Sequence, residues 1–175
     1  MRYDLAEIEN QIIYTLQSNS TLQTISPQIR THAGDINPSV FYTQEGQEGF
    51  IKLLPFIYVQ YQGRVKRLAD STKKTVVYSL RFRIYTGAKN LRLKRDAQLS
   101  AYDMLSATYD ALHGKIPKAV DNANWAVPLL SGDTIQTPAT FLSPLEAPEG
   151  ENEKLLVNIP NIVVYQSDYS LQVIA

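Results

Sequence analysis

Strict alternation of apolar and polar side chains along residues 75–86 constrains the fold more than any other feature of the chain. Successive side chains of a β-strand point to opposite faces of the sheet, so a period of two predicts a strand with one buried face. Residues 162–174 repeat the pattern almost as strictly. The two apolar faces consist of Val76, Tyr78, Leu80, Phe82, Ile84 and of Val163, Tyr165, Tyr169, Leu171, Val173. Two long half-buried strands of this kind predict a largely antiparallel sheet.

Two amphipathic helices are expected to cover the apolar face of this sheet. Residues 3–18 place apolar side chains such as Leu5 and Ile8 three or four positions apart, and residues 96–113 show the same helical periodicity. Gly114 provides a natural stop for the second helix. The order of helix, strand, strand, helix and then several strands predicts an α+β fold. We expect a largely antiparallel sheet with two main helices packed on one face.

The segments before the first alternating run are less regular. Residues 51–61 predict a strand with Pro55 at its start or on an edge, because proline cannot donate a ladder hydrogen bond. Residues 64–74 predict a basic connection of hairpin type, too long for a tight turn. Residues 18–49, rich in small polar residues, glycine and proline, predict a long connection or extended polar arm.

The segments after the second helix predict short elements. Residues 126–130 and 134–142 have the composition of short strands interrupted by proline and glycine. Residues 145–153 form an acidic stretch with proline and glycine, which predicts a solvated loop. With 175 residues in total, the chain is expected to form one domain.

Catalytic and metal-binding patterns do not occur in the sequence. The chain has no cysteine, which excludes thiol nucleophiles, thiolate ligands and disulfides. Its two histidines, His32 and His113, lie in the polar arm and at a helix end, without the spacing of a metal site. Phosphate-binding glycine loops and nucleophile elbows are also missing. We therefore expect neither an enzyme nor a protein with a cofactor.

The sequence also predicts no membrane partner. Its first residues include Asp4, Glu7 and Glu9 and lack the basic start and apolar run of a secretory signal. No apolar run approaches the ~20 residues that are needed to cross a bilayer. We expect a protein that is made and kept in the cytoplasm unless an assembly takes it elsewhere.

Charge is strongly segregated along the chain although the formal net charge is zero. Residues 64–95 hold eleven basic residues and one acidic residue, which leaves this segment at plus ten. Residues 121–175 hold seven acidic residues and one lysine, which leaves them at minus six. Such asymmetry indicates either an anionic partner for the basic segment or complementary surfaces that meet between copies of the protein.

The basic segment allows two interpretations. Arginine and lysine interleaved with Tyr78, Phe82 and Tyr85 are able to contact phosphates and stack on bases, which is the nucleic-acid hypothesis. Alternatively, Arg81 and Arg83 form the polar face of a half-buried strand, and the cluster at 89–95 pairs with acids of a neighbouring protein. Known sheet-based RNA readers carry glycine-aromatic motifs that are missing here, which favours the interface.

The run RFRIYTGAKNLRLKRDAQLSAYDMLSATYDALHGKIP, residues 81–117, resembles the most recognisable segment of a tail terminator family. That family is encoded by Mu-like phages and prophages, just upstream of the tail sheath gene, and was long described as a domain of unknown function. The matching positions are Tyr85, Ala88-Lys89-Asn90-Leu91-Arg92, Tyr102 to Leu105, Leu112-His113-Gly114, Leu54-Pro55, Gly63 and Val163-Val164-Tyr165. They occur in family order across the chain, whereas the segments 18–49 and 146–153 are longer than the family pattern.

The resemblance implies a structural protein of a phage, prophage or tailocin with one tail-terminator-like domain over residues 1–175. Such proteins form a ring, hexameric in related terminators, which caps the tail tube and the sheath and stops elongation. The ring then offers a surface for head joining at the head-proximal end of the virion tail. Expected partners are further copies of the chain, tube and sheath proteins, the head-tail connector, and DNA that passes through the channel without specific binding.

Two sets of residues follow as candidate contact sites of the ring. For the subunit or tail-tube interface we expect the basic residues Lys89, Arg92, Lys94, Arg95, Arg81 and Arg83. For the complementary acidic surface we expect Glu146, Glu149, Glu151, Glu153 and Asp168. Two alternatives stay open: a head-tail connector of another position, and a nucleic-acid-binding accessory protein that uses the basic segment.

Overall fold

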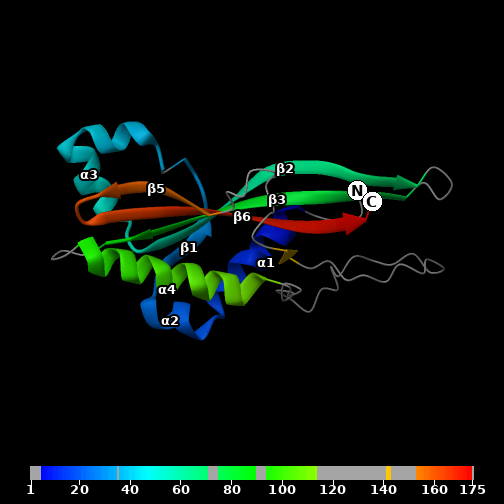
Figure 1. Cartoon of the computed structure of the whole chain (residues 1–175), viewed down its shortest axis with the longest axis horizontal. Helices are drawn as coiled ribbons and strands as arrows, with labels where there is room; N and C mark the ends of the chain where they lie inside the picture. Colours follow the sequence, from blue (N-terminus) through cyan, green and yellow to red (C-terminus); the bar gives the residue numbers. More distant parts are fainter. Residues whose placement is uncertain are drawn as a thin grey trace.

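The computed structural model describes residues 5–34, 36–70, 75–89, 94–113, 141–142 and 153–174. Its centre is a six-stranded sheet whose longest strands are β2 (Phe56–Asp70), β3 (Thr75–Ala88) and β6 (Ile162–Ile174). β3 lies between β2 and β6 and pairs antiparallel with both (Figure 1). The predicted alternating strands and the largely antiparallel sheet are confirmed.

Shorter strands complete the sheet at its edges. β1 (Gln28–Thr31) pairs parallel with the start of β2, and it is the only parallel pair among the described strands. β5 (Glu153–Ile159) and β4 (Phe141–Leu142) pair antiparallel with different parts of β6. Pro160 and Asn161 join β5 to β6, and Asn161 takes the positive φ of 67° that such a tight turn needs.

One face of the sheet carries the main helices, as predicted. α1 (Leu5–Gln17) and α4 (Lys94–Leu112) pack against β2, β3 and β6, with the short α2 (Ser20–Ile25) beside α4. The helix stripe and the inward side chains of the strands form one apolar core. Its fully buried members include Ile8, Ile12, Leu16, Leu22, Ile57, Val59, Leu80, Ile84, Ala97, Ala101, Met104, Val163 and Leu171.

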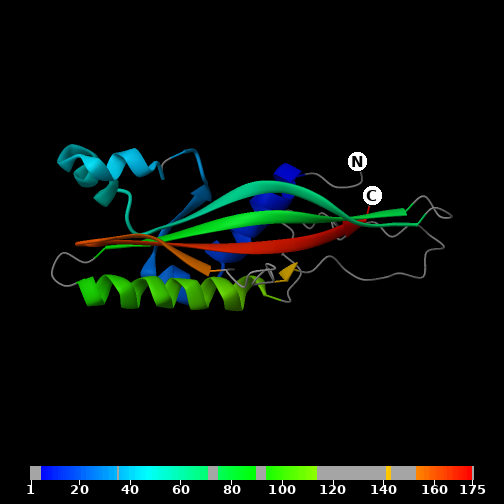
Figure 2. The same cartoon turned by 45° about the horizontal axis from the view of Figure 1, so that its top comes forward.

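The opposite face is covered at one end of the sheet, which the sequence did not predict. A 3-10 helix, η1 (Pro38–Tyr42), and α3 (Gln44–Ile51) lie over this face, on the other side of the sheet from α4 (Figure 2). Phe50 of α3 meets Phe56 of β2 edge to face, with ring centroids 5.6 Å apart. The side chains under η1 and α3 form a second apolar core, which consists of Phe50, Leu54, Phe56, Tyr58, Tyr85, Ile162 and Val164. Alternate residues of the same strands therefore supply two separate cores.

The prediction of a long polar connection over residues 18–49 was wrong. This segment contains α2, β1, η1 and most of α3. Polar side chains start these short helices: the Asn19 carboxamide accepts hydrogen bonds from the amides of Thr21 and Leu22, and Thr43 Oγ1 accepts one from Gly46. Isolated apolar residues such as Leu22 then anchor the turns to the core. Such short elements have no periodicity of their own to reveal them.

The boundaries around β2 also differ from the prediction. Pro55 lies directly before the strand, as expected, but residues 51–54 belong to the end of α3 and a turn. The expected basic connection at 64–74 is strand up to Asp70. Irregular pairing at Tyr61/Gly63 and at Lys66/Leu68 lets β2 stay paired to β3 despite its mixed composition. Residues 71–74 lie outside the described part of the chain.

The later predictions are tested only in part. Residues 126–130 and 134–140, and the acidic stretch up to residue 152, lie outside the described ranges. Phe141–Leu142 is a strand, as expected, whereas Glu153 opens β5 instead of ending a loop.

Beyond the helices, β2, β3 and β6 continue together as a long arm at one end of the molecule (Figures 1 and 2).

Candidate interaction surfaces

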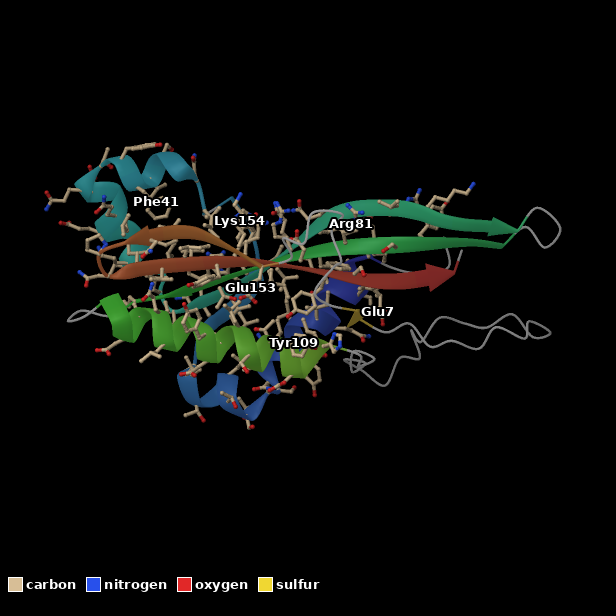
Figure 3. All side chains as sticks on the ribbon, in the orientation of Figure 1. Glu7, Phe41, Arg81, Tyr109, Glu153 and Lys154 are labelled. Atoms are coloured by element: carbon tan, nitrogen blue, oxygen red, sulfur yellow. The ribbon has the colours of Figure 1, made fainter. Side chains whose placement is uncertain are left out.

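Strand geometry divides the basic residues of the arm between its two faces. Arg64 lies opposite Leu80, on the side of α1 and α4, and its guanidinium carbon is 4.6 Å from the ring centroid of Tyr78. Arg81 and Arg83 point to the other side because they alternate with the buried residues of β3. Arg81 is exposed on the arm (Figure 3). The basic segment, which is continuous in sequence, therefore forms two separate basic patches on opposite faces of the arm.

Arg83 forms an ion pair with Asp168 inside one chain. The two residues are direct register partners on β3 and β6. Arg83 Nε donates to Asp168 Oδ1 at 2.8 Å and Nη2 donates to Oδ2 at 3.2 Å. The hydrogen bonds to Asp168 raise the pKa of the Arg83 guanidinium above its ordinary value. One predicted basic residue and one predicted acidic residue thus offset each other within a subunit.

Only some of the other predicted contact residues lie in the described part of the chain. Lys89 is half-buried directly after β3, and Glu153 is exposed at the start of β5. Lys94 and Arg95 open α4, but their side chains lie outside the described part. Arg92, Glu146, Glu149 and Glu151 also lie outside it. Among the described side chains of the two predicted sets, Arg83 and Asp168 are the pair that the structure brings together.

Polar side chains from β1, β2 and β3, together with His32 directly after β1, extend the surface beside this ion pair. Arg30 donates a hydrogen bond to the Tyr58 hydroxyl at 3.2 Å and lies over the Tyr58 ring. Tyr85 donates to Gln60 Oε1 at 3.0 Å, and the His32 ring lies 4.9 Å from that of Tyr85. Arg30 was not predicted as a contact residue because β1 lies in a segment that was predicted to be a connection. Tyr58 and Gln60 lie in the predicted strand 51–61, and Tyr85 was named in the nucleic-acid hypothesis. A four-residue strand offers too little alternation to be found in advance.

On the α4 side, Tyr165 donates a hydrogen bond to the Tyr102 hydroxyl at 3.2 Å. The two rings lie 5.6 Å apart, and Tyr165 is the register partner of Leu155 on β5. Burial and the Tyr102 hydroxyl raise the pKa of Tyr165 to about 12. Tyr102 therefore contacts the sheet through Tyr165, but 49% of its surface is exposed.

A hollow of about 370 Å³ lies beside β5 on the opposite face of the sheet. It is lined by Ile36, Phe41, Tyr42, Tyr85, Leu156, Val157, Asn158, Ile159 and Gln166. Most of these side chains are apolar, and Tyr42 is 85% exposed. Phe41 lies between α3 and β5 (Figure 3). The hollow therefore offers a mostly apolar surface.

No group of three or more histidine and acidic side chains in the described ranges is arranged to hold a metal ion. None of the described helices is both long enough and apolar enough to span a bilayer.

No family model matches the chain, and no curated protein matches it either. Among solved structures, the chain is similar to a component of the virion of a native gene transfer agent particle. The two share 13% sequence identity at a TM-score of 0.49, and the alignment covers 97% of this chain and 96% of that one.

Proposed function

We propose that the protein is a structural component of a phage or prophage tail that acts as a tail terminator. In this role a hexameric ring of subunits caps the tail tube and the sheath, stops elongation, and provides the surface to which the head joins. The protein works through contacts with other proteins and catalyses no reaction.

The observation that carries the proposal is the terminator-like run at 81–117 together with its place in the fold. Its first part ends β3 at Ala88, and its Tyr102–Leu105 element lies in α4, which packs on that strand. Val163–Tyr165 is part of β6 and pairs with the end of β3. The motifs that resemble the family therefore form one contiguous unit of strand, helix and strand, which supports a shared architecture.

Segregated charge supports assembly into a ring. A closed ring built from head-to-tail contacts needs two different surfaces on each subunit that complement each other. The basic cluster at 89–95 and the acidic stretch at 146–153 offer opposite charges for such a contact. Arg83 and Asp168 already pair with each other, so we now assign less of the contact to them and more to Arg81, Lys94 and Arg95.

The same geometry favours protein contact over nucleic-acid binding. A phosphate backbone is bound best by cations that follow one surface. Here Arg64 and Arg81 lie on opposite faces of the arm, and Asp168 neutralises Arg83. Purified protein is therefore expected to show no salt-sensitive DNA binding. A gel-shift titration at low salt checks this expectation.

Deletion of the gene from its phage or prophage tests the proposal. Electron microscopy of the resulting particles should show tails that are overlong or irregular and lack heads. Tails of normal length that merely fail to join heads would instead indicate a connector of another position. Particles with normal tails and heads would contradict both roles.

Charge reversal tests the assigned ring contact. Lys94→Glu combined with Arg95→Glu places acids in the first turn of α4, where the helix dipole favours them, so the fold should be kept. We expect loss of ring formation or of tail docking at low salt. Lys52→Glu, at an exposed position after α3, is the matched control and should assemble normally. Normal assembly of the double variant would refute this contact.

A further inference from the structure

β5 is an edge strand of a kind that proteins usually protect. Within the described ranges, no strand pairs with its outer edge. At the other edge of the sheet, side chains of α1 make hydrogen bonds with β1. Gln17 donates to the Ile29 carbonyl at 3.4 Å, and the Thr31 hydroxyl donates to Glu9. An exposed edge presents a row of backbone donors and acceptors that is ready to pair with another chain.

Apolar side chains flank this edge on the α4 side. Leu155 of β5 is 41% exposed and lies next to Tyr165, whose ring contacts Tyr102. Tyr102 and Leu99, three residues apart on α4, are each 49% exposed. Large apolar groups left open to water in one area are typical of a surface that another molecule covers.

Apolar side chains flank the edge on the other side as well. Leu156 of β5 is 38% exposed and lines the hollow together with Tyr42, which is the most exposed large apolar residue described. Leu155 pairs with Tyr165 and Val157 pairs with Val164, so Leu156 is the extra residue of a bulge, and it lines the hollow on the face opposite Leu155. A strand added to β5 would therefore meet apolar surface on both of its faces.

We call the outer edge of β5, with Leu155, Tyr102 and Leu99 on one face and Leu156 and Tyr42 on the other, the slot. Its apolar surface on both faces defines the kind of strand that it accepts. Strands buried on both faces consist of nearly continuous apolar residues instead of alternating ones. Charge around the slot adds a second requirement. Glu45 and Glu48 are exposed on α3, the helix that follows Tyr42 in the chain, and Glu153 is exposed at the start of β5. Lys154 is the only basic residue of β5. Acidic surroundings favour basic residues at the ends of the incoming segment.

We propose that β5 accepts an extended apolar segment of a partner protein, flanked by lysine or arginine, as an additional strand of the sheet. Backbone hydrogen bonds to β5 supply affinity, and the two apolar surfaces select the side chains. Binding of this kind is expected whether or not the protein terminates phage tails.

A synthetic peptide of alternating isoleucine and valine, with a pair of lysines at each end and a fluorescent label, serves as the probe. Fluorescence anisotropy should show saturable binding to the full chain. The same peptide with alternate backbone nitrogens methylated cannot form the strand ladder, and we expect its affinity to fall at least ~10-fold. A peptide with glutamates in place of the lysines should also bind more weakly.

Variants of the slot assign the binding to β5. Leu156→Glu and Tyr42→Ser change exposed side chains, so folding should be unaffected, and each should weaken binding by ~10-fold or more. Tyr14→Ser, on α1 and 41% exposed, is the matched control and should bind as the native chain does. The proposal is wrong if the native chain shows no saturable binding, if the methylated peptide binds equally well, or if both slot variants bind normally.

Discussion

Arg83 and Asp168, 85 residues apart in sequence, lie directly opposite each other on β3 and β6 and form a bidentate ion pair. The sequence presents them as members of two oppositely charged segments. The fold instead makes them partners within one sheet, with 30% and 23% of their side chains exposed. Charge segregation along a chain therefore overstates the charge that is left for other molecules.

The strength of this ion pair is measurable in a double-mutant cycle with Arg83→Ala and Asp168→Ala. Because both side chains are partly exposed, we expect a coupling free energy of about 0.5–1 kcal/mol. Salt should reduce it. Urea unfolding at low and high salt gives the values. Arg81→Ala, on the same face, should change stability by less than ~0.5 kcal/mol. A coupling free energy that salt does not change would contradict the description of Arg83 and Asp168 as a partly exposed ion pair.

Tyr165 predicts how stability depends on pH in alkaline solution. Its pKa rises from 10.0 to about 12 in the folded protein, so the neutral form is favoured by folding. The resulting contribution to stability is complete below pH 10, the unfolded pKa, and is lost as the pH rises through about 12. Thermal unfolding of Tyr165→Phe should show a shallower alkaline decline than the native chain. Equal declines in both proteins would rule out this residue as the cause.

Gly87 of β3 should not accept a side chain. A Cβ at this position would overlap the ring of Phe56 and lie 2.8 Å from Leu54 Cδ2. Overpacking of this kind should make Gly87→Ala less stable by about 1–3 kcal/mol. Gly49 of α3 has open space around it, so Gly49→Ala should be neutral or stabilising by up to ~1 kcal/mol. Urea unfolding of both variants provides the comparison, and similar losses in the two would contradict the packing argument.

Leu22 tests whether the segment 18–49 contributes to folding. Its side chain is 1% exposed in the main core. Leu22→Ala should therefore reduce the free energy of unfolding by about 2–5 kcal/mol. The cap residue of the same helix offers a milder change: Asn19→Ala should lose about 1 kcal/mol. A polar arm without structure would show no loss in either variant, so denaturant unfolding decides between the two descriptions.

The elements that could be predicted are the long periodic ones. Residues 75–86 and 162–174 alternate over many positions, and the apolar stripe of α4 recurs over several turns, so each pattern repeats often enough to be seen. The short elements differ. α2, β1 and η1 contain four to six residues each, and their signals are a capping asparagine or one apolar side chain. Such signals also occur in ordinary loops.

The sequence by itself determined the α+β class, the two buried strand faces, the main helices and the exclusion of cysteine chemistry, because periodicity and composition are local properties of the chain. Only the tertiary structure decided which residues meet. The pairing of Arg83 with Asp168 depends on the register between β3 and β6, and the slot beside β5 depends on where α4 and η1 pack. Register and packing are set by contacts between distant segments, which a local pattern cannot encode.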